Sequence, residues 1–391
     1  MRVMRILTRP NLGGPTRQCI ALWHAMCDLS VPTLLVTGQV ANGETALDPA
    51  AFGVPRLTVE QVLAGGEAVA GVVEVPSLGR GFAPLADRRT RACLLAMLRA
   101  FRPDVVHTHT SKAGWLGRSA ARAVGVPVIA HTFHGHVLDD YFPGPIAWWL
   151  SRMERRLAQH THLVFTVSDS CADELAAKGV VARDRFLIIP PAVPLPAVRP
   201  RAEARQRLGI PGGERRVVAV GRLVPIKRLQ DFVAAVGLLP DVHGDVVGDG
   251  PERAALEQQG ARLAKGRVHC RGPLPEIAGD LAAYDALVLP SVREGWPLVA
   301  LEAFAARVPV VGYDVPGVRD ALAQGRGVLV PVAAGPAGLA AALRSLFEPP
   351  SRVAGLVATG AAFVPMCDPA RVARGLRAAY ATALARRTSL P

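Results

Sequence analysis

Residues 286–307 of the chain read ALVLPSVREGWPLVALEAFAAR. An apolar run of strand length ends at Pro290, a loop carries Glu294, and residues 295–297 begin an apolar helix that continues to Arg307. A buried strand that leads through a short loop into a helix is the repeating unit of a parallel sheet covered by helices.

The same stretch places polar groups where a ligand can bind. The amides of Leu298 and Val299 open the helix without partners inside it, and such amides suit a phosphate. Glu302 lies within the apolar helix, where an unpaired carboxylate is costly, so it either holds a diol such as a ribose or pairs with an arginine. Glu294 either accepts hydrogen bonds from sugar hydroxyls or is a solvated loop acid. The strand, the turn and the helix together favour ligand binding.

Apolar runs alternate with helical stretches along the whole chain, which indicates an α/β fold with parallel sheets. Two sets of candidate strands are each sufficient for one doubly wound domain. The first set is 4–8, 33–37, 105–107, 128–131 and 163–167, and the second is 217–220, 245–247, 268–270, 286–289 and 308–311.

A proline-rich connector separates the two sets. Residues 190–200 hold five prolines in eleven positions, which excludes a helix interior and a central strand. We therefore predict an N-terminal Rossmann-like domain of residues 1–195 and a C-terminal one of residues 196–368. Residues 369–391 are expected to form a helix that packs toward the first domain, because an apolar face repeats along it.

The charge of the chain indicates an anionic partner. Its 45 Lys and Arg residues outnumber 32 Asp and Glu residues, for a formal net charge of +13 over 391 residues. The excess is spread over both halves and only 5% of residues are aromatic, so nucleic acid is not expected as a partner. Phosphorylated small molecules and acidic membrane surfaces fit better.

No stretch has the length and composition of a membrane-spanning helix, and the basic start lacks a signal-peptide core. We therefore expect a cytoplasmic protein. Its six scattered cysteines are expected to be reduced, mostly buried thiols.

A second motif, residues 217–228 (VVAVGRLVPIKR), leads from a strand into a loop. Gly221 lets the backbone turn or approach a ligand, and Arg222 and Lys227 then reach the carboxyl edge of the sheet. A guanidinium grips a diphosphate in a bidentate manner, whereas an ammonium acts as a mobile point charge. Structural salt bridges are the alternative. Taken together with the motif at residues 286–307, this motif favours the interpretation that Arg222 and Lys227 bind a phosphate.

Two glycine-containing loops also follow strands. Residues 248–251 (GDGP) include Gly250, and residues 11–17 (NLGGPTR) include Gly14. Each loop is either a tight turn or a place where backbone amides meet a phosphate or a sugar. The spacing G-x-G-x-x-G is absent from the second loop, so a nicotinamide site is not indicated.

Histidines follow two strands of the first half, as His107 and His109 and as His131, His134 and His136. No Cys or acidic residue shares the spacing of a metal motif, so we predict no metal site. His134 suits hydrogen bonding to a sugar hydroxyl or a leaving phosphate, whereas His107 and His131 are expected to be packed.

Residues 139–156 combine aromatic side chains, among them Tyr141, Phe142, Trp148 and Trp149, with three arginines. This mixture suits an anionic bilayer surface or a lipid-linked acceptor. A well-packed helix with a cationic face is the alternative.

These motifs together resemble the retaining glycosyltransferases of family 4, which have the GT-B fold. The stretch from Glu294 to Glu302, of the form E-x7-E, is the most specific part. The likeness covers nearly the whole chain and also includes 13–14, 103–109, 131–135, 165–168, 221–223 with 227, and 248–251. It implies two Rossmann-like domains that face each other across a cleft, with the C-terminal helix crossing back to the first.

The resemblance implies transfer of a sugar from a nucleotide diphosphate sugar, with retained anomeric configuration and without a metal or other cofactor. The donor diphosphate would lie on two cations and two amides, those of Arg222, Lys227, Leu298 and Val299. The glycines close to the donor would be Gly14, Gly221, Gly250 and Gly295. Glu302 would hold the ribose, Glu294 would face the donor sugar, and His134 would lie near the reacting centre.

The chemistry of the residues agrees with this. Fixed cations and a helix N-terminus stabilise a departing nucleoside diphosphate without a metal. A retaining hydrolase needs carboxyls about 5 to 5.5 Å apart, whereas eight residues of helix would separate Glu294 from Glu302 by about 12 Å. We therefore expect no protein nucleophile, and we expect the departing phosphate to take the acceptor proton.

The resemblance to this family suggests a UDP-sugar donor, a lipid-linked or polysaccharide acceptor, and peripheral contact with the inner face of the membrane. Two alternatives stay open at this point. One is a related nucleotide-sugar 2-epimerase, which isomerises its donor without an acceptor. The other is a non-catalytic sensor of sugar nucleotides.

Overall fold

The computed structural model of the chain describes residues 1–11, 13–40, 45–66, 69–79, 81–135, 144–348 and 350–388. They form two compact α/β units. Unit 1 comprises Met1–Pro194 and Met366–Pro391, and unit 2 comprises Leu195–Pro365.

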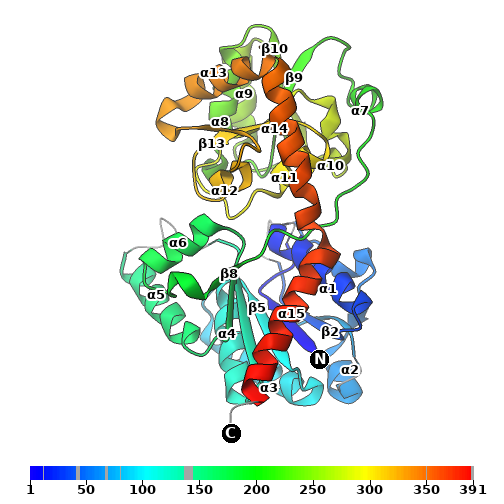
Figure 1. The fold of residues 1–391 in the computed structure, drawn as a ribbon, viewed down its shortest axis with the longest axis vertical. Coiled ribbons are helices and arrows are strands. Elements are labelled where there is room, and N and C mark those ends of the chain that lie inside the picture. Colours follow the sequence, from blue (N-terminus) through cyan, green and yellow to red (C-terminus); the bar gives the residue numbers. More distant parts are fainter. Residues whose placement is uncertain are drawn as a thin grey trace. The chain divides into compact units, whose positions relative to one another are not determined.

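Unit 1 alternates strands with helices (Figure 1). Its strands are β1 (Val3–Leu7), β2 (Thr33–Thr37), β3 (Arg56–Leu57), β4 (Gly71–Glu74), β5 (Val105–His109), β6 (Val128–Phe133), β7 (Leu163–Thr166) and β8 (Phe186–Ile188). Its helices are α1 (Gly14–Asp28), α2 (Val59–Gly65), α3 (Pro84–Phe101), α4 (Ser111–Ala123), α5 (Gly144–Ala158), α6 (Asp169–Ala177) and α15 (Pro369–Thr388).

The strands of unit 1 form one parallel sheet. Within the described residues its order is β3-β4-β2-β1-β5-β6-β7-β8. The order changes direction at β1, which pairs with β2 on one side and β5 on the other. Open α/β sheets bind ligands at the carboxyl ends of the strands beside such a change.

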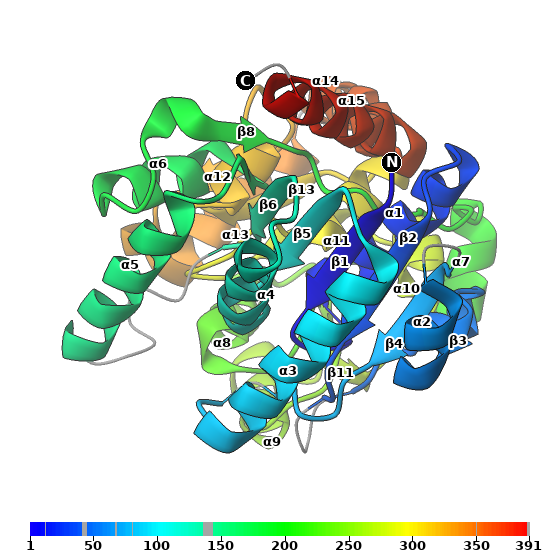
Figure 2. The ribbon, with the colours of Figure 1, turned by 90° about the horizontal axis from the view of Figure 1, so that it is seen from below.

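Helices cover both faces of this sheet, as Figure 2 shows, with α3 and α4 on one face and α1 and α15 on the other. The core under α3 and α4 includes Met4, Leu94 and Phe101. The core on the other face includes Leu22 of α1 and Tyr380 of α15. The two faces bury alternate residues of each strand.

Helix α15 packs on unit 1 through the apolar face that its sequence shows. The Asp368 carboxylate accepts a hydrogen bond from the Arg371 amide at 2.8 Å and so caps the helix. Val372, Leu376 and Tyr380 are at most 6% exposed and belong to the core that α15 shares with α1.

Unit 2 has the same plan. Its strands are β9 (Arg215–Val220), β10 (Val242–Val247), β11 (Val268–Gly272), β12 (Ala286–Leu289), β13 (Val310–Tyr313) and β14 (Val328–Val330). Its helices are α7 (Arg201–Leu208), α8 (Leu229–Gly237), α9 (Arg253–Ala264), α10 (Ile277–Asp280), α11 (Leu298–Ala305), α12 (Val318–Leu322), α13 (Gly335–Phe347) and α14 (Pro350–Phe363). The strands pair in parallel in the order β11-β10-β9-β12-β13-β14.

The predicted α/β class with two doubly wound parallel sheets is confirmed. All ten predicted strands are present, with ends that differ by up to three residues. The strands β3, β4, β8 and β14, which are two to four residues long, were not predicted. Helix α9 begins at Arg253, two residues after the GDGP loop that ends at Pro251.

The connector between the units is extended and carries no helix or strand from Ile189 to Pro200. Its end is fixed to unit 2, because the Arg199 amide donates to the Gly279 carbonyl at 2.9 Å and the Arg199 guanidinium donates to Asp280 at 3.0 Å.

All six cysteines are free, and Cys19, Cys171 and Cys367 are buried. Among the described residues, no single helix is long and apolar enough to cross a membrane, and only the bent pair of Val353–Cys367 and Pro369–Arg387 passes when its two helices are combined.

Candidate active site

Four neighbouring strands of unit 2 deliver their loops to one edge of its sheet. Strands β10, β9, β12 and β13 lie side by side and run in the same direction, so their carboxyl ends meet at that edge. The loops that follow contain most of the donor-binding residues that the sequence predicts.

Two of these loops pack backbone against backbone. A Cβ added to Gly248 would lie 1.9 Å from the Gly221 carbonyl oxygen, and one added to Gly250 would lie 2.5 Å from the Leu223 carbonyl oxygen. The Leu223 amide donates to the Asp249 carbonyl at 2.9 Å. Gly248 and Gly250 are therefore required for the loops to approach each other, whatever ligand they bind.

Lys227 and Glu294 form an ion pair across this edge. The Lys227 ammonium donates to Glu294 Oε1, and the Ser291 hydroxyl donates to the same oxygen at 2.8 Å. The two charged side chains are 22% and 12% exposed. Lys227 thus forms the salt bridge that the sequence left as the alternative, and Glu294 is not a freely solvated loop acid.

Arg222 differs from Lys227 in this respect. It is exposed at the end of β9, and its side chain has no hydrogen-bonding or ionic partner in the described part of the chain. An exposed guanidinium without a carboxylate partner keeps all five of its donors for an anion.

Helix α11 begins at Leu298, directly after the residues 295–297 at which the sequence places its start, and Pro297 occupies its N-cap position without a side-chain cap. The loop before α11 packs against the backbone of Gly317. A Cβ added to Gly317, which has a φ of +81°, would lie 2.4 Å from the Glu294 carbonyl oxygen and 2.7 Å from that of Gly295. The backbone at Gly317 therefore supports the loop that leads into α11.

Glu302 is 6% exposed and lies between Leu301 and Ala303, which are fully buried. It follows Leu298 by four residues and Val299 by three, so the three side chains share one face of α11. Helical side chains lean toward the N-terminus, which directs the Glu302 carboxylate toward the first turn.

In unit 1, the loop after β1 leads into α1. Gly14 is the first residue of this 15-residue helix, Gly13 is its N-cap, and no side chain caps it. Free amides of the first turn thus lie at the carboxyl end of β1. Leu12 lies outside the described residues.

His134 follows β6 and contacts His109, which ends β5. His109 Nδ1 and His134 Nε2 are 3.0 Å apart. Behind them lies Arg5 of β1, which is fully buried, with its Nη1 3.4 Å from His109 Nε2. These residues come from three neighbouring strands.

The direction of each hydrogen bond follows from Arg5. A guanidinium can only donate, so His109 Nε2 accepts and the His109 proton lies on Nδ1. His109 Nδ1 then donates to His134 Nε2, and the His134 proton must lie on Nδ1. Arg5 thereby selects the tautomer in which His134 keeps an Nδ1–H donor.

Arg5 also reaches α15. Its Nη2 donates to the Tyr380 hydroxyl at 3.4 Å, the Tyr380 hydroxyl donates to His107 Nδ1 at 2.5 Å, and His107 Nε2 donates to Thr132 at 2.6 Å. His107 and His131 are at most 1% exposed, which confirms that they are packed.

Burial keeps these imidazoles neutral. It lowers the pKa of His134 to about 4, with a further contribution from the positive charge of Arg5. It also holds the pKa values of His107, His109 and His131 well below the ordinary value, because the charged form loses its hydration. Among the described residues, no group of three or more His, Cys, Asp or Glu side chains is arranged to hold a metal ion.

The basic aromatic segment is described in part. Trp148 and Trp149 of α5 are 65% and 49% exposed, and the guanidinium carbon of Arg152 lies 5.8 Å from the centre of the Trp148 ring. His136 and residues 139–142 lie outside the described residues.

Three supporting residues were not singled out from the sequence, namely Arg5, Ser291 and Gly317. Tyr380 was expected only as part of the apolar face of the C-terminal helix. Gly317 has a local signal, the Pro-Gly turn at 316–317, whereas Arg5 and Ser291 take their places through strand register and loop packing.

Two family models match the chain. The model described as Glycosyltransferase Family 4 matches residues 50–195, and the one described as Glycosyl transferases group 1 matches residues 214–349.

Several relatives are similar over much of the chain. The 2-deoxystreptamine N-acetyl-D-glucosaminyltransferase of Streptomyces fradiae is 31% identical over 337 residues, which cover 77% of this chain and 79% of that protein. The D-inositol 3-phosphate glycosyltransferase of Thermobispora bispora is 28% identical over 89% of this chain and 85% of its own. The UDP-Gal:alpha-D-GlcNAc-diphosphoundecaprenol alpha-1,3-galactosyltransferase of Escherichia coli is 30% identical over 62% of this chain, and the match spans 66% of that enzyme.

Solved structures share the architecture. Sucrose-phosphate synthase of Thermosynechococcus elongatus superposes with a TM-score of 0.77 at 20% identity, over 99% of this chain and 100% of that one. Anabaena HepE in complex with UDP and glucose superposes with a TM-score of 0.74 at 19% identity, over 98% and 100% of the two chains.

Proposed function

Because the chain belongs to glycosyltransferase family 4 and has the GT-B fold, we propose that it transfers a sugar from a UDP-sugar to a glycan or lipid-linked acceptor. We propose further that the anomeric configuration is retained and that no metal is required. The observation that carries the proposal is the edge of unit 2 where Arg222 and the first turn of α11 flank the Glu294 loop.

The proposed donor site follows from this edge. Arg222 and the amides of Leu298 and Val299 bind the diphosphate, since they combine an exposed guanidinium with a helix N-terminus. Glu302 binds the ribose from the face of α11 below those amides. Glu294 faces the donor sugar with its second carboxylate oxygen, because Oε1 already accepts from Lys227 and Ser291.

In the proposed reaction, the bond between the anomeric carbon and the diphosphate breaks and a bond to the acceptor oxygen forms on the same face. The acceptor proton passes to the departing phosphate oxygen. Arg222 and the α11 amides stabilise the charge that develops on the leaving group. Lys227 stays paired with Glu294 and can give another of its three ammonium donors to the diphosphate when the donor binds.

Glu294 is not proposed as a nucleophile. Its carboxylate is neutralised by Lys227 and held by Ser291, which lowers its reactivity and fixes its direction. His134 is proposed to donate its Nδ1–H to the donor sugar or to the leaving phosphate.

Three observations support the choice of UDP and of the acceptor. The relative from Escherichia coli is named for UDP-Gal and a diphosphoundecaprenol acceptor. A relative from Bacillus subtilis is named a putative teichuronic acid biosynthesis glycosyltransferase. The exposed tryptophans and arginines of α5 suit an anionic membrane surface that would present such an acceptor.

The experiment that tests the proposal is product analysis of the full chain with a panel of UDP-sugars, with and without polyprenyl-diphosphate-linked acceptors. We expect UDP release and a new α- or β-linked product whose configuration matches that of the donor. Isomerised donor formed without an acceptor would instead indicate an epimerase. Tight donor binding without any turnover would indicate a sensor.

A further inference from the structure

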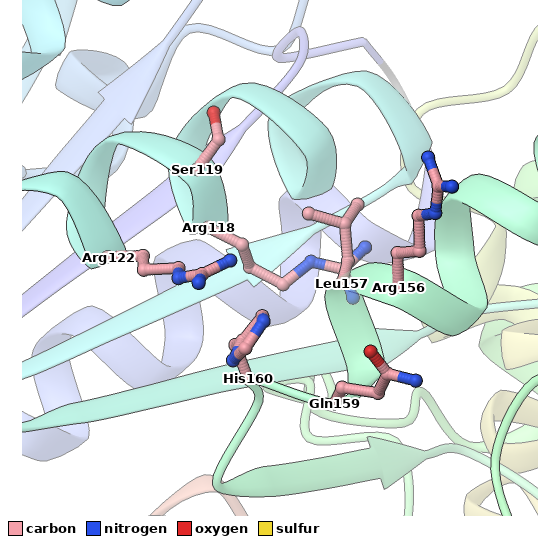
Figure 3. A pocket seen from close by; sticks show the side chains of 7 residues that line it. All are labelled: Arg118, Ser119, Arg122, Arg156, Leu157, Gln159 and His160. Atoms are coloured by element: carbon pink, nitrogen blue, oxygen red, sulfur yellow. The ribbon is translucent and has the colours of Figure 1, made fainter.

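A pocket of about 390 Å³ lies in unit 1 between the C-terminal parts of α4 and α5. Figure 3 shows its lining, in which side chains from α4 face side chains from the end of α5 and the loop after it. The lining residues are Arg118, Ser119, Arg122, Arg156, Leu157, Gln159 and His160.

The pocket is separate from the candidate active site. Helices α4 and α5 run back from the carboxyl ends of β5 and β6, so their last turns lie at the amino ends of the strands. His134 follows β6 at the opposite edge. A ligand in the pocket and a ligand at His134 therefore occupy opposite edges of the sheet.

One lining residue, Arg118, forms a buried ion pair with Glu154, which does not itself line the pocket. Arg118 is 3% exposed and Glu154 is 5% exposed, and their side chains are 2.5 Å apart. Arg118 Nε also donates to the Gly114 carbonyl at 2.9 Å. Arg118 thus neutralises the charge of Glu154, so Glu154 does not neutralise the other cations of the pocket.

The other basic groups of the pocket have no partner of their own in the part of the chain that the structure describes. Arg122, Arg156 and His160 are exposed, and within the described residues none of their side chains has a hydrogen-bonding or ionic partner. The lining contains no carboxylate. Arg122 and Arg156 lie in the last turns of their helices, where a cation interacts favourably with the helix dipole. That interaction explains one cation at the end of each helix. It does not explain why both arginines and His160 line the same pocket.

We propose that this pocket binds a phosphate oxyanion, as the monoester or diester of a polyol. Two guanidinium groups offer planar pairs of donors that match phosphate oxygens, and the Gln159 amide and His160 imidazole offer further donors. The volume exceeds that of a phosphate alone and leaves room for an attached polyol.

The phosphate can come from two sources, a soluble sugar phosphate or a phospholipid headgroup. Helix α5 connects the pocket to an exposed aromatic surface, because Trp148, Arg152 and Arg156 follow one another at intervals of four residues on one stripe of the helix. This stripe would let a headgroup enter the pocket while Trp148 meets the lipid surface.

The test compares three forms of the full-length protein: the wild type, the double variant Arg122→Gln/Arg156→Gln, and the control Arg88→Gln/Arg91→Gln. The control removes the same charge from exposed arginines of α3 that also lack partners in the described residues. Binding of glycerol 3-phosphate is measured by calorimetry at constant ionic strength. Binding to vesicles of phosphatidylcholine with and without phosphatidylglycerol is measured by sedimentation.

We expect wild type and control to bind at least one of the two probes and the double variant to bind it about tenfold or more weakly. Loss with glycerol 3-phosphate identifies a soluble ligand, and loss with phosphatidylglycerol vesicles alone identifies a headgroup. Equal binding by all three proteins, equal losses in both variants, or no binding of either probe by wild type would overturn the proposal. Sugar transfer to a soluble acceptor is expected to stay unchanged in the double variant, so this result is independent of the proposed function.

Discussion

His109 Nδ1 and His134 Nε2 lie 3.0 Å apart, at the ends of two neighbouring strands of unit 1. Because Arg5 can only donate to the far side of His109, this contact has one direction. Arg5, a fully buried residue of β1, therefore orients the imidazole of His134 through His109.

Replacing Arg5 with Met is expected to lower the turnover number without lowering stability. The variant frees both tautomers of His109 and His134, and it also removes a buried guanidinium that has no carboxylate partner in the described residues. An apolar side chain of similar length often replaces such a charge at no cost. The measurements are steady-state kinetics, the melting temperature and imidazole nitrogen chemical shifts.

Arg5→Lys serves as the matched variant, since it keeps the positive charge and a hydrogen-bond donor but loses the planar pair of guanidinium donors. We expect it to recover part of the turnover. Full activity in Arg5→Met, or a loss of activity that only follows a loss of stability, would show that Arg5 does not position His134.

The buried imidazoles predict a loss of stability in acid. The unfolded chain takes up protons near the ordinary histidine pKa of 6.5, whereas His134 in the folded chain does so only near about 4. The unfolded state therefore binds more protons in this window, and the free energy of unfolding falls as the pH drops through it, by up to about 3 kcal/mol for this residue.

Urea unfolding of wild type and His134→Asn between about pH 7 and pH 4.5 checks this. The wild type should lose stability more steeply than the variant. His160→Asn, which changes an exposed histidine, should follow the wild type. Parallel curves for wild type and His134→Asn would contradict the prediction.

Arg222→Gln is expected to lower kcat/KM by about 100-fold, because it removes the free guanidinium proposed to stabilise the leaving diphosphate. The melting temperature should stay within error of wild type, since Arg222 is exposed and makes no ion pair in the described residues. Arg262→Gln, an exposed arginine of α9, is the control and should leave kcat/KM unchanged. If Arg222→Gln kept the kcat/KM of the wild type, Arg222 would not be part of the donor site.

Gly250→Ala is expected to destabilise unit 2 by about 1–3 kcal/mol, because the new Cβ would lie 2.5 Å from the Leu223 carbonyl oxygen. The displaced loop should also weaken UDP binding. Gly355→Ala in α14 is the matched control, since its Cβ meets nothing within 4 Å, and it should stabilise the protein by about 0.5–1 kcal/mol. Thermal unfolding measures the stability, and calorimetry measures the binding of UDP. A Gly250→Ala protein with the stability and UDP affinity of the wild type would refute the argument that the two loops need a glycine here.

The sequence predicts the central strands and the start of α11 because each signal is local. Strand β12 is an uninterrupted apolar run that Pro290 ends, and the Gly-Trp-Pro turn sets the helix start at Leu298. The short edge strands, such as Arg56–Leu57, carry no such signal, because pairing with β4 alone makes them strands.

The pairing inside the sites depends on register and could not be predicted. Arg5 meets His109 because β1 and β5 are neighbours in one register, although 104 positions separate them. The sequence shows Lys227 and Glu294 as two separate ligand groups, whereas the structure pairs them with each other. Contacts between distant loops follow from the completed sheet.

The most direct test of the central claim is a crystal structure of the full chain with a bound UDP-sugar. We predict that the diphosphate lies within hydrogen-bonding distance of Arg222 and of the Leu298 and Val299 amides, and that the ribose hydroxyls contact Glu302. A diphosphate bound elsewhere, or a Glu302 carboxylate that faces away from the nucleotide, would contradict the account.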